Sequence, residues 1–359
     1  MASSPILETA NNRNQLYLIQ YSSGEYEKFK PLFDELEEYL IDLINKNPEK
    51  LQTAKGFKEL QSLANKKIEE LILSQNIDFI ADYELLAKQQ AEFVELSLNR
   101  AVLNFTAVIP SISAILREAY RVPMVLGNTA ISLDELSQQI TTETKKNVRN
   151  ALYLGYADGR TSDQIIASLR GDKEVKGAIP QSRLDTERVV RTALNHVATT
   201  ARQRTNRENK KLVIGYRWLS TLDSRTSPIC RDRDGEVYLY SDDFNPIPPA
   251  HYFCRSTTTQ ELNPKYKIKG LDEGRTRSSK GSEGGKQVSS NLNYYEWLKT
   301  QPASFQDEAL GRTRGLIFRN SGLSIDEFKK ATVNQFGQTL TIEQMTEKNN
   351  QIAEYLDDL

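Results

Sequence analysis

Glycine is scarce in the first half of this chain, and that scarcity strongly constrains its fold. Before Gly155, glycine occurs only at Gly24, Gly56 and Gly127. Apolar residues in the same half recur at three- and four-residue spacing, the period of a helix with one buried face. The clearest run comprises Phe29, Leu32, Phe33, Leu36, Leu40 and Leu43. Few chain-breaking residues and a helical period together predict a helical N-terminal region over residues 1–131.

Capping-box patterns predict where further helices begin. In such a box a Ser or Thr and a Glu or Gln three residues later satisfy free backbone amides at the helix start. The boxes are Ser132–Glu135, Thr161–Gln164, Ser324–Glu327 and Thr341–Gln344. The first predicts a helix that runs to about Tyr156. A longer helix is expected over residues 182–209.

The composition changes after this helix, which predicts a mixed fold. Residues 212–219 and 236–240 are rich in β-branched and aromatic residues, as strands are. Asp234-Gly235 is typical of a turn that joins two strands. We therefore expect an α+β, predominantly helical fold in four regions. They are a helical N-terminal region (1–131), a core of helices and a small β motif (132–265, β motif 212–260), a flexible Gly/Ser linker (266–290) and a helical C-terminal tail (291–359).

Composition excludes several classes of protein. Forty-seven Lys and Arg balance 48 Asp and Glu, so the chain is not a globally basic nucleic-acid binder. Two cysteines cannot form a disulfide framework, which favours synthesis in a reducing cytosol. The start lacks the pattern of a secretory signal. Residues 101–116 are apolar but too short and polar to span a bilayer, and segment 101–131 is either core or a surface for a partner.

Both cysteines and one of the two histidines lie close together near the end of the β motif. Thiolate and imidazole are preferred zinc ligands, so Cys230, His251 and Cys254 predict a possible zinc site. Asp223 is a candidate fourth ligand, and water is another. The alternative is that these side chains simply pack in a small β-rich core. A cysteine nucleophile activated by His251 is a further alternative, and no catalytic residue is assigned.

A basic stripe runs along the helix over residues 182–209 and into the following strand. Its predicted DNA contacts are Arg188, Arg191, Arg202, Arg204, Arg207, Lys210 and Lys211. Between Arg183 and Arg217 the formal charge is +6, which is enough for salt-sensitive, sequence-independent binding to phosphates. The alternative is a solvated helix whose arginines pair with acids elsewhere in the chain.

The region from Trp218 to Arg255 resembles the phage head morphogenesis family, whose members are also called MuF-like minor head proteins. The resemblance rests on the ordered set Trp218, Asp223, Arg225, Thr226, Cys230, Asp234, Gly235, Pro248, Pro249, His251, Cys254 and Arg255. It extends more weakly over residues 132–330. This chain departs from the family pattern at Ser227, where many members have cysteine, and at Ala193, where an acid is usual.

The resemblance implies a structural role in tailed-phage heads. A minor head protein or minor capsid protein of this kind would associate with the portal protein or the major capsid protein. It would belong to the virion, at the head interior or portal vertex, and contact with packaged double-stranded DNA is possible during DNA packaging. Two alternatives remain open: a metal- or cysteine-dependent enzyme such as a nuclease, and a simple sequence-independent DNA-binding module.

Overall fold

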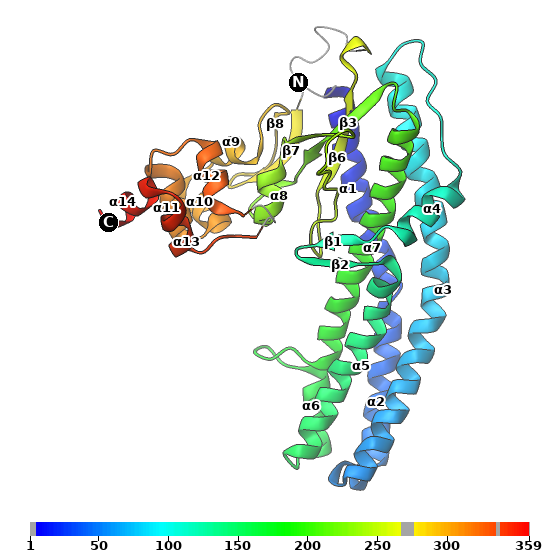
Figure 1. Cartoon of the computed structure of the whole chain (residues 1–359). Helices are drawn as coiled ribbons and strands as arrows, with labels where there is room; N and C mark the ends of the chain where they lie inside the picture. Colours follow the sequence, from blue (N-terminus) through cyan, green and yellow to red (C-terminus); the bar gives the residue numbers. More distant parts are fainter. Residues whose placement is uncertain (1–4, 267–275, 335–337, 359) are drawn as a thin grey trace.

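The computed structural model describes residues 5–266, 276–334 and 338–358. The fold is α+β and predominantly helical, as expected. A long helical bundle forms one arm, and the C-terminal helices project sideways from its upper part, so that the molecule is L-shaped (Figure 1). Small β-sheets lie where the two arms meet.

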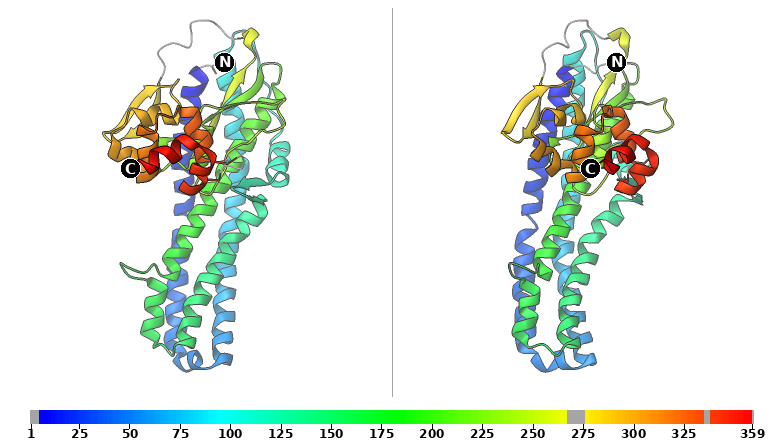
Figure 2. Two further views of the ribbon diagram at one scale, coloured as in Figure 1. Left: turned by 60° about the vertical axis from the view of Figure 1, so that its left-hand side comes forward. Right: turned by 90° about the vertical axis from the view of Figure 1, so that its left-hand side faces the viewer.

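Five helices build the long arm. They are α1 (Pro5–Glu27), α2 (Lys30–Lys46), α3 (Ala54–Ala101), α5 (Leu133–Ala157) and α7 (Ala178–Glu208). The first two follow one another down the bundle, α3 returns along its full length, α5 descends and α7 ascends (Figure 2). Apolar side chains of all five form one continuous core. The short helix α6 (Ser162–Arg170) closes the far end of the bundle against α5 and α2.

Helix α3 runs without a break from Ala54 to Ala101. It is a single helix of 48 residues, about 70 Å long at 1.5 Å per residue. No glycine or proline interrupts it after Gly56, so nothing in the sequence forces a break. The segment 101–131 contains helix α4 (Ile112–Arg121) and a two-stranded ribbon of β1 (Met124–Leu126) and β2 (Thr129–Ile131).

All four predicted capping boxes are present. In each, the Ser or Thr side chain accepts a hydrogen bond from the backbone N–H of the third helical residue. The side chain of that third residue in turn accepts a hydrogen bond from the backbone N–H of the Ser or Thr. The helix that begins after Ser132 ends at Ala157, close to the predicted Tyr156. A fifth box, at Asn293 and Glu296, starts α9 (Tyr294–Lys299).

The two predicted strands belong to a three-stranded antiparallel sheet, in which the first is the central strand and the second is an edge strand. Strand β3 (Val213–Leu219) pairs with β5 (Val237–Leu239) on one side and with β6 (Thr257–Leu262) on the other. Asp234-Gly235 is not the tight turn expected between β3 and β5. The connection is long, because it also contains β4 (Leu222–Asp223) and α8 (Pro228–Arg233).

Part of the predicted flexible linker is an ordered β-hairpin. Residues 267–275 lie outside the described residues, but β7 (Thr276–Gly281) and β8 (Gly284–Ser289) pair along their full length. Strand β7 also pairs with β4 in parallel, which attaches the hairpin to the core. Gly284 lies at the hairpin's tight turn with a φ of +91°, a conformation that glycine adopts readily.

The C-terminal arm has its own apolar core. Its remaining helices are α10 (Ala303–Leu310), α11 (Arg312–Asn320), α12 (Ile325–Thr332), α13 (Ile342–Lys348) and α14 (Asn350–Asp357). Aromatic side chains of α9, α11 and α12 pack against one another at its centre, in tilted or edge-to-face pairs. The helical tail is therefore confirmed for the described residues, while the exact division into domains stays a prediction. Among the described helices, none is both long and apolar enough to cross a membrane.

Candidate functional site

The two cysteines and His251 converge beside the central sheet. Cys230 lies on α8, whereas His251 and Cys254 lie on the loop that leads into β6. Their potential ligand atoms all lie within 4.8 Å of one another. We call Cys230, His251 and Cys254 the Cys/His cluster. Trp218 of β3 is fully buried and packs against its two thiols.

Backbone contacts fix the loop that carries His251 and Cys254. It begins with a buried cis peptide bond between Pro248 and Pro249. Asn195 of α7 donates a hydrogen bond to the Cys254 carbonyl oxygen at 2.8 Å. Helix α7 thus holds the loop against the sheet, which places the two loop ligands opposite Cys230.

The geometry of the Cys/His cluster fits a tetrahedral zinc ion. With Zn–S bonds of about 2.3 Å and Zn–N bonds of about 2.0 Å, ligand atoms lie about 3.5–3.8 Å apart. The two Sγ atoms are 3.7 Å apart, which lies within this range, whereas Cys230 Sγ and His251 Nε2 are 3.2 Å apart, closer than in an ideal site. The other ring nitrogen, Nδ1, lies 2.7 Å from the Tyr252 carbonyl oxygen. An N–H at Nδ1 would leave the Nε2 lone pair for a metal, as outer hydrogen bonds commonly do.

Electrostatics within the cluster separate the two thiols. Burial raises the pKa of the Cys230 thiol, and the neighbouring Cys254 sulfur raises it further. Burial also raises the pKa of Cys254, but hydrogen bonds from Cys230 and His251 outweigh it and hold that pKa well below its ordinary value. Cys254 is therefore the thiol that ionises first, in contact with the imidazole that stabilises it.

Asp223, the candidate fourth ligand, does not belong to the Cys/His cluster. Its buried carboxylate pairs with both Nη atoms of Arg255, with 2.9 Å between Oδ1 and Nη2. It also accepts hydrogen bonds from the Arg225 backbone N–H and the Thr226 hydroxyl, each at 3.1 Å. Burial raises the pKa of Asp223, but Arg255 and these donors hold it below its ordinary value. The family-motif residues around Asp223 therefore connect the turn at residues 223–226 to the loop before β6, which carries Arg255.

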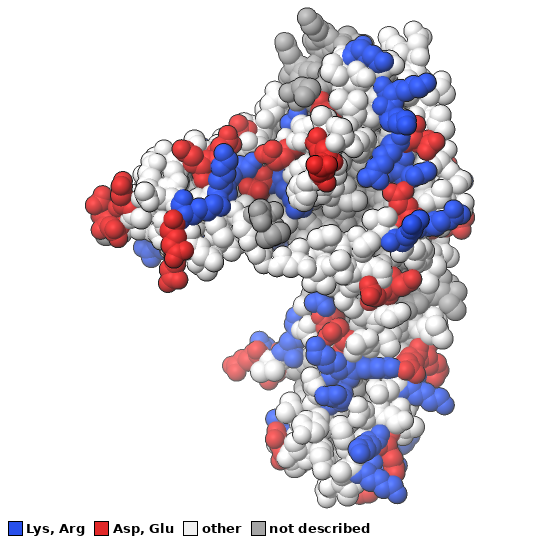
Figure 3. Space-filling model, in the orientation of Figure 1, with Lys and Arg blue, Asp and Glu red and all other residues white. Residues whose placement is uncertain are grey.

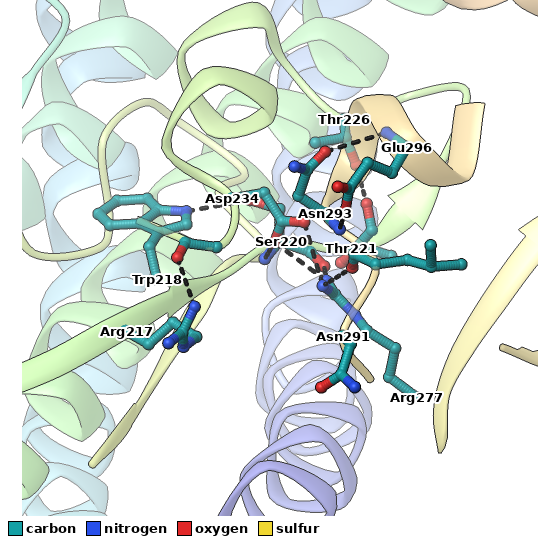
Figure 4. A network of polar contacts seen from close by, with 12 residues as sticks. Arg217, Trp218, Ser220, Thr221, Thr226, Asp234, Arg277, Asn291, Asn293 and Glu296 are labelled. Atoms are coloured by element: carbon teal, nitrogen blue, oxygen red, sulfur yellow. Dashed lines mark hydrogen bonds and ion pairs between the residues drawn. The ribbon is translucent and has the colours of Figure 1, made fainter. Parts of the chain in front are cut away.

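A fully buried ion pair joins the core to the hairpin. Arg277 of β7 donates to both carboxylate oxygens of Asp234, at 3.0 and 3.1 Å, and also to the Ser220 carbonyl oxygen. Figure 4 shows the guanidinium close to Ser220 and Asp234, with Trp218 on the other side of these two residues. The next residue, Gly235, has a φ of +85°, so glycine is required there. Sequence reasoning missed Arg277 because it lay in the presumed linker.

The predicted basic stripe is dispersed in the structure. Arg202 is 1% exposed and cannot contact DNA at the surface, which corrects its assignment. Arg191 pairs with Glu187 at 2.8 Å, and Arg188 pairs with Asp185 and stacks on a tyrosine ring. These pairs favour the alternative interpretation for the middle of α7, where arginines are neutralised by acids.

Basic side chains nevertheless gather at the end of α7, together with α4. We call this the basic patch; its members are Arg117, Arg121, Arg204, Arg207, Lys210 and Lys211. Figure 3 shows blue side chains in a band over this part of the molecule, with red ones among them. Glu118 pairs with Arg204 and Arg207, at 3.6 and 3.1 Å. Among the described residues, no ion pair involves the other four members. Two of the members, Arg117 and Arg121, lie outside the predicted stripe.

Comparison with known proteins identifies the central part of the chain. Residues 146–259 match the family described as Phage Mu protein F like protein. The similarity covers about a third of the chain. No curated protein and no solved structure matches the chain.

The matched segment confirms the resemblance drawn from Trp218 to Arg255. It begins within α5 and ends within β6, so it includes α7, the central sheet and the whole Cys/His cluster. Similarity to this phage Mu F like family indicates a role in phage head morphogenesis and interaction with other head proteins.

Proposed function

We propose that this protein is a minor head protein of a tailed phage, bound at the portal vertex or on the inner face of the capsid. One observation carries the proposal: the phage Mu F like segment coincides with the structural junction of the molecule. It contributes α7 to the long arm, and through Asp234 and Asp223 it contacts the hairpin and the C-terminal arm.

The contacts around this junction suit a structural role. Tyr294 of α9 donates a hydrogen bond to the Asp223 carbonyl oxygen at 2.8 Å, and Lys329 of α12 pairs with Glu236. The C-terminal arm is therefore attached to the family core by one buried and one partly exposed polar contact. Such a core would present two rigid surfaces at a fixed angle to neighbouring head subunits.

Quantitative mass spectrometry of purified particles tests this proposal. Portal and major capsid subunits in the same particles provide internal standards for copy number. We expect a few to a dozen copies per portal ring in heads, and none in separated tails. Absence from heads, with abundant protein in the infected lysate, would contradict a virion component.

We also propose that the basic patch contacts packaged DNA. Six basic side chains and the acids Glu118 and Glu208 give it a formal charge of +4. A patch that neutralises about four phosphates should lose about 100-fold in affinity between 50 and 200 mM salt. The Arg117→Ala/Arg121→Ala variant should lower the salt slope by about two.

The matched control removes the same charge elsewhere. Arg188→Ala/Arg191→Ala deletes two arginines that already have acidic partners, so it should leave the slope unchanged. Fluorescence anisotropy with a double-stranded oligonucleotide measures all three slopes. Equal slopes for the two double variants would show that the basic patch is not the DNA contact.

A further inference from the structure

A cleft of about 600 Å³ opens directly onto the Cys/His cluster. Its walls come from α1, α7 and the loop before β6, and they include His251 and Cys254. Cys230 and Cys254 are 1% and 6% exposed, so the cluster has a buried side and one side at the cleft. A group in the cleft can therefore reach the position where a fourth metal ligand would sit.

No protein ligand fills that fourth position among the described residues. The Cys/His cluster contains three potential ligands and no nearby carboxylate. Ser227, three residues before Cys230, lines the cleft at this point. Its buried hydroxyl oxygen has no hydrogen-bond partner of normal geometry in the described part of the chain. Zinc sites with three protein ligands keep the fourth position for water or an exchangeable ligand.

The cleft favours an anion. Arg191, Arg225 and Arg255 line it, against the single acid Glu187. Arg225 is the least engaged of the three, because its side chain is 75% exposed and its pair with Asp223 spans 4.0 Å. A carboxylate that entered the cleft would meet a guanidinium and the open metal position together, and oxygen is an accepted zinc donor.

We propose that Cys230, His251 and Cys254 bind one zinc ion whose fourth coordination position takes a carboxylate from this cleft. Ser227 leaves the position open, and Arg225 attracts the ligand. The carboxylate is either an acidic side chain of a partner protein or a small free acid. The inference does not depend on the proposed location in the phage head, since it rests on the cluster and cleft alone.

Cobalt substitution of the full-length protein tests the inference without an activity assay. Four-coordinate Co²⁺ has visible bands that change when a ligand exchanges, and thiolate-to-cobalt charge transfer reports the number of cysteines bound. We expect one Co²⁺ per chain, two bound thiolates and a saturable change of the visible bands on addition of acetate. Perchlorate at equal ionic strength should cause no change. Absence of Co²⁺ binding, or of an acetate response, would overturn the proposal.

Variants at Ser227 locate the open position. Ser227→Cys supplies a third thiolate, so charge transfer should increase about 1.5-fold and the acetate response should disappear. Ser227→Ala should keep the acetate response. It is the companion variant because a smaller side chain at this position should not prevent folding. A full acetate response in correctly folded Ser227→Cys would refute the assignment. If that variant does not fold, the wild-type and Ser227→Ala titrations still decide the outcome.

Variants at arginine test the role of the cleft. Arg225→Ala should weaken acetate about two- to fivefold without changing Co²⁺ affinity, as expected for one exposed charge. Arg149→Ala, which removes an exposed arginine of α5 outside the cleft, is the matched control and should change neither affinity. Equal acetate affinity in both variants would remove Arg225 from the site. A capped tri-glutamate peptide that binds more tightly than acetate would assign the ligand to a protein partner, and equal affinity would assign it to a small acid.

Discussion

Removal of the Arg277 side chain should destabilise the junction between the family core and the hairpin. The side chains of Arg277 and Asp234 are 2% and 0% exposed, and two contacts of 3.0 and 3.1 Å join them. Arg277→Met keeps the approximate length of the side chain but leaves a buried carboxylate unpaired. Breaking a buried pair in this way typically costs about 3–5 kcal/mol. The Ser220 carbonyl oxygen would also lose its donor.

The same hairpin provides a matched control. Lys286 and Glu283 form an ion pair at its turn, with side chains 58% and 74% exposed. Exposed pairs contribute about 0–1 kcal/mol, so Lys286→Ala should have little effect. Urea unfolding gives the change in free energy, and hydrogen exchange of residues 276–289 shows whether the loss is local. If Arg277→Met lowered the free energy of unfolding by no more than about 1 kcal/mol beyond the effect of Lys286→Ala, the buried pair would not stabilise the junction as argued.

Asp234 itself completes the test. Asp234→Asn keeps an oxygen acceptor for the Ser220 backbone N–H, which the carboxylate binds at 2.6 Å, but removes the charge. The double variant Asp234→Asn/Arg277→Met buries no unpaired charge. It should therefore be more stable than the sum of the single changes predicts, by about 1–3 kcal/mol. Simple additivity of the two changes would mean that the charges do not interact.

Three further predictions concern other parts of the molecule. Zinc at about 1,000 times its dissociation constant should stabilise the wild type by about 4 kcal/mol in thermal unfolding, and His251→Ala should abolish this gain. Burial raises the pKa of Asp232 from 3.8 to about 6, so the native state binds the carboxyl proton more tightly than the unfolded state does. The stability that this proton provides is lost as the pH rises from about 4 to about 6. Asp232→Asn should thus stabilise the protein by about 1–3 kcal/mol at pH 7.5 and by nothing at pH 3, which paired denaturation curves would check. Ser132→Ala should cost about 1 kcal/mol through loss of the cap on α5, whereas the adjacent exposed change Asp134→Asn should cost less.

Local signals in this sequence predict local structure well. Capping boxes act within four residues, and for that reason Ser132 and Thr161 located their helices correctly. The Cys/His cluster was also predictable, because few residue types bind zinc and both cysteines of the chain lie within 25 residues. The pattern could not show that Asp223 turns away to Arg255, since that choice depends on how two loops meet.

Long-range pairing explains what the sequence did not reveal. The stripe on α7 sums to a high charge only if distant acids are ignored. Glu118, far earlier in the chain, pairs with Arg204 and Arg207 once α4 packs against α7. The hairpin was missed for a similar reason, because its inward residues are Arg277 and Ser279 rather than apolar ones. A strand stabilised by a buried ion pair does not show the usual apolar alternation.

The position of Ser227 connects the structural role with the proposed ligand exchange. A cysteine at position 227 would be a fourth protein ligand, would close the metal site and would leave the cleft without access to the metal. With serine there, the same three ligands that hold α8 against the loop before β6 can also bind a group from outside the chain. Binding of a neighbour's carboxylate would then tighten the junction between the two arms. Assembly could thus stabilise this protein at the point where its family core, its cleft and its two arms meet.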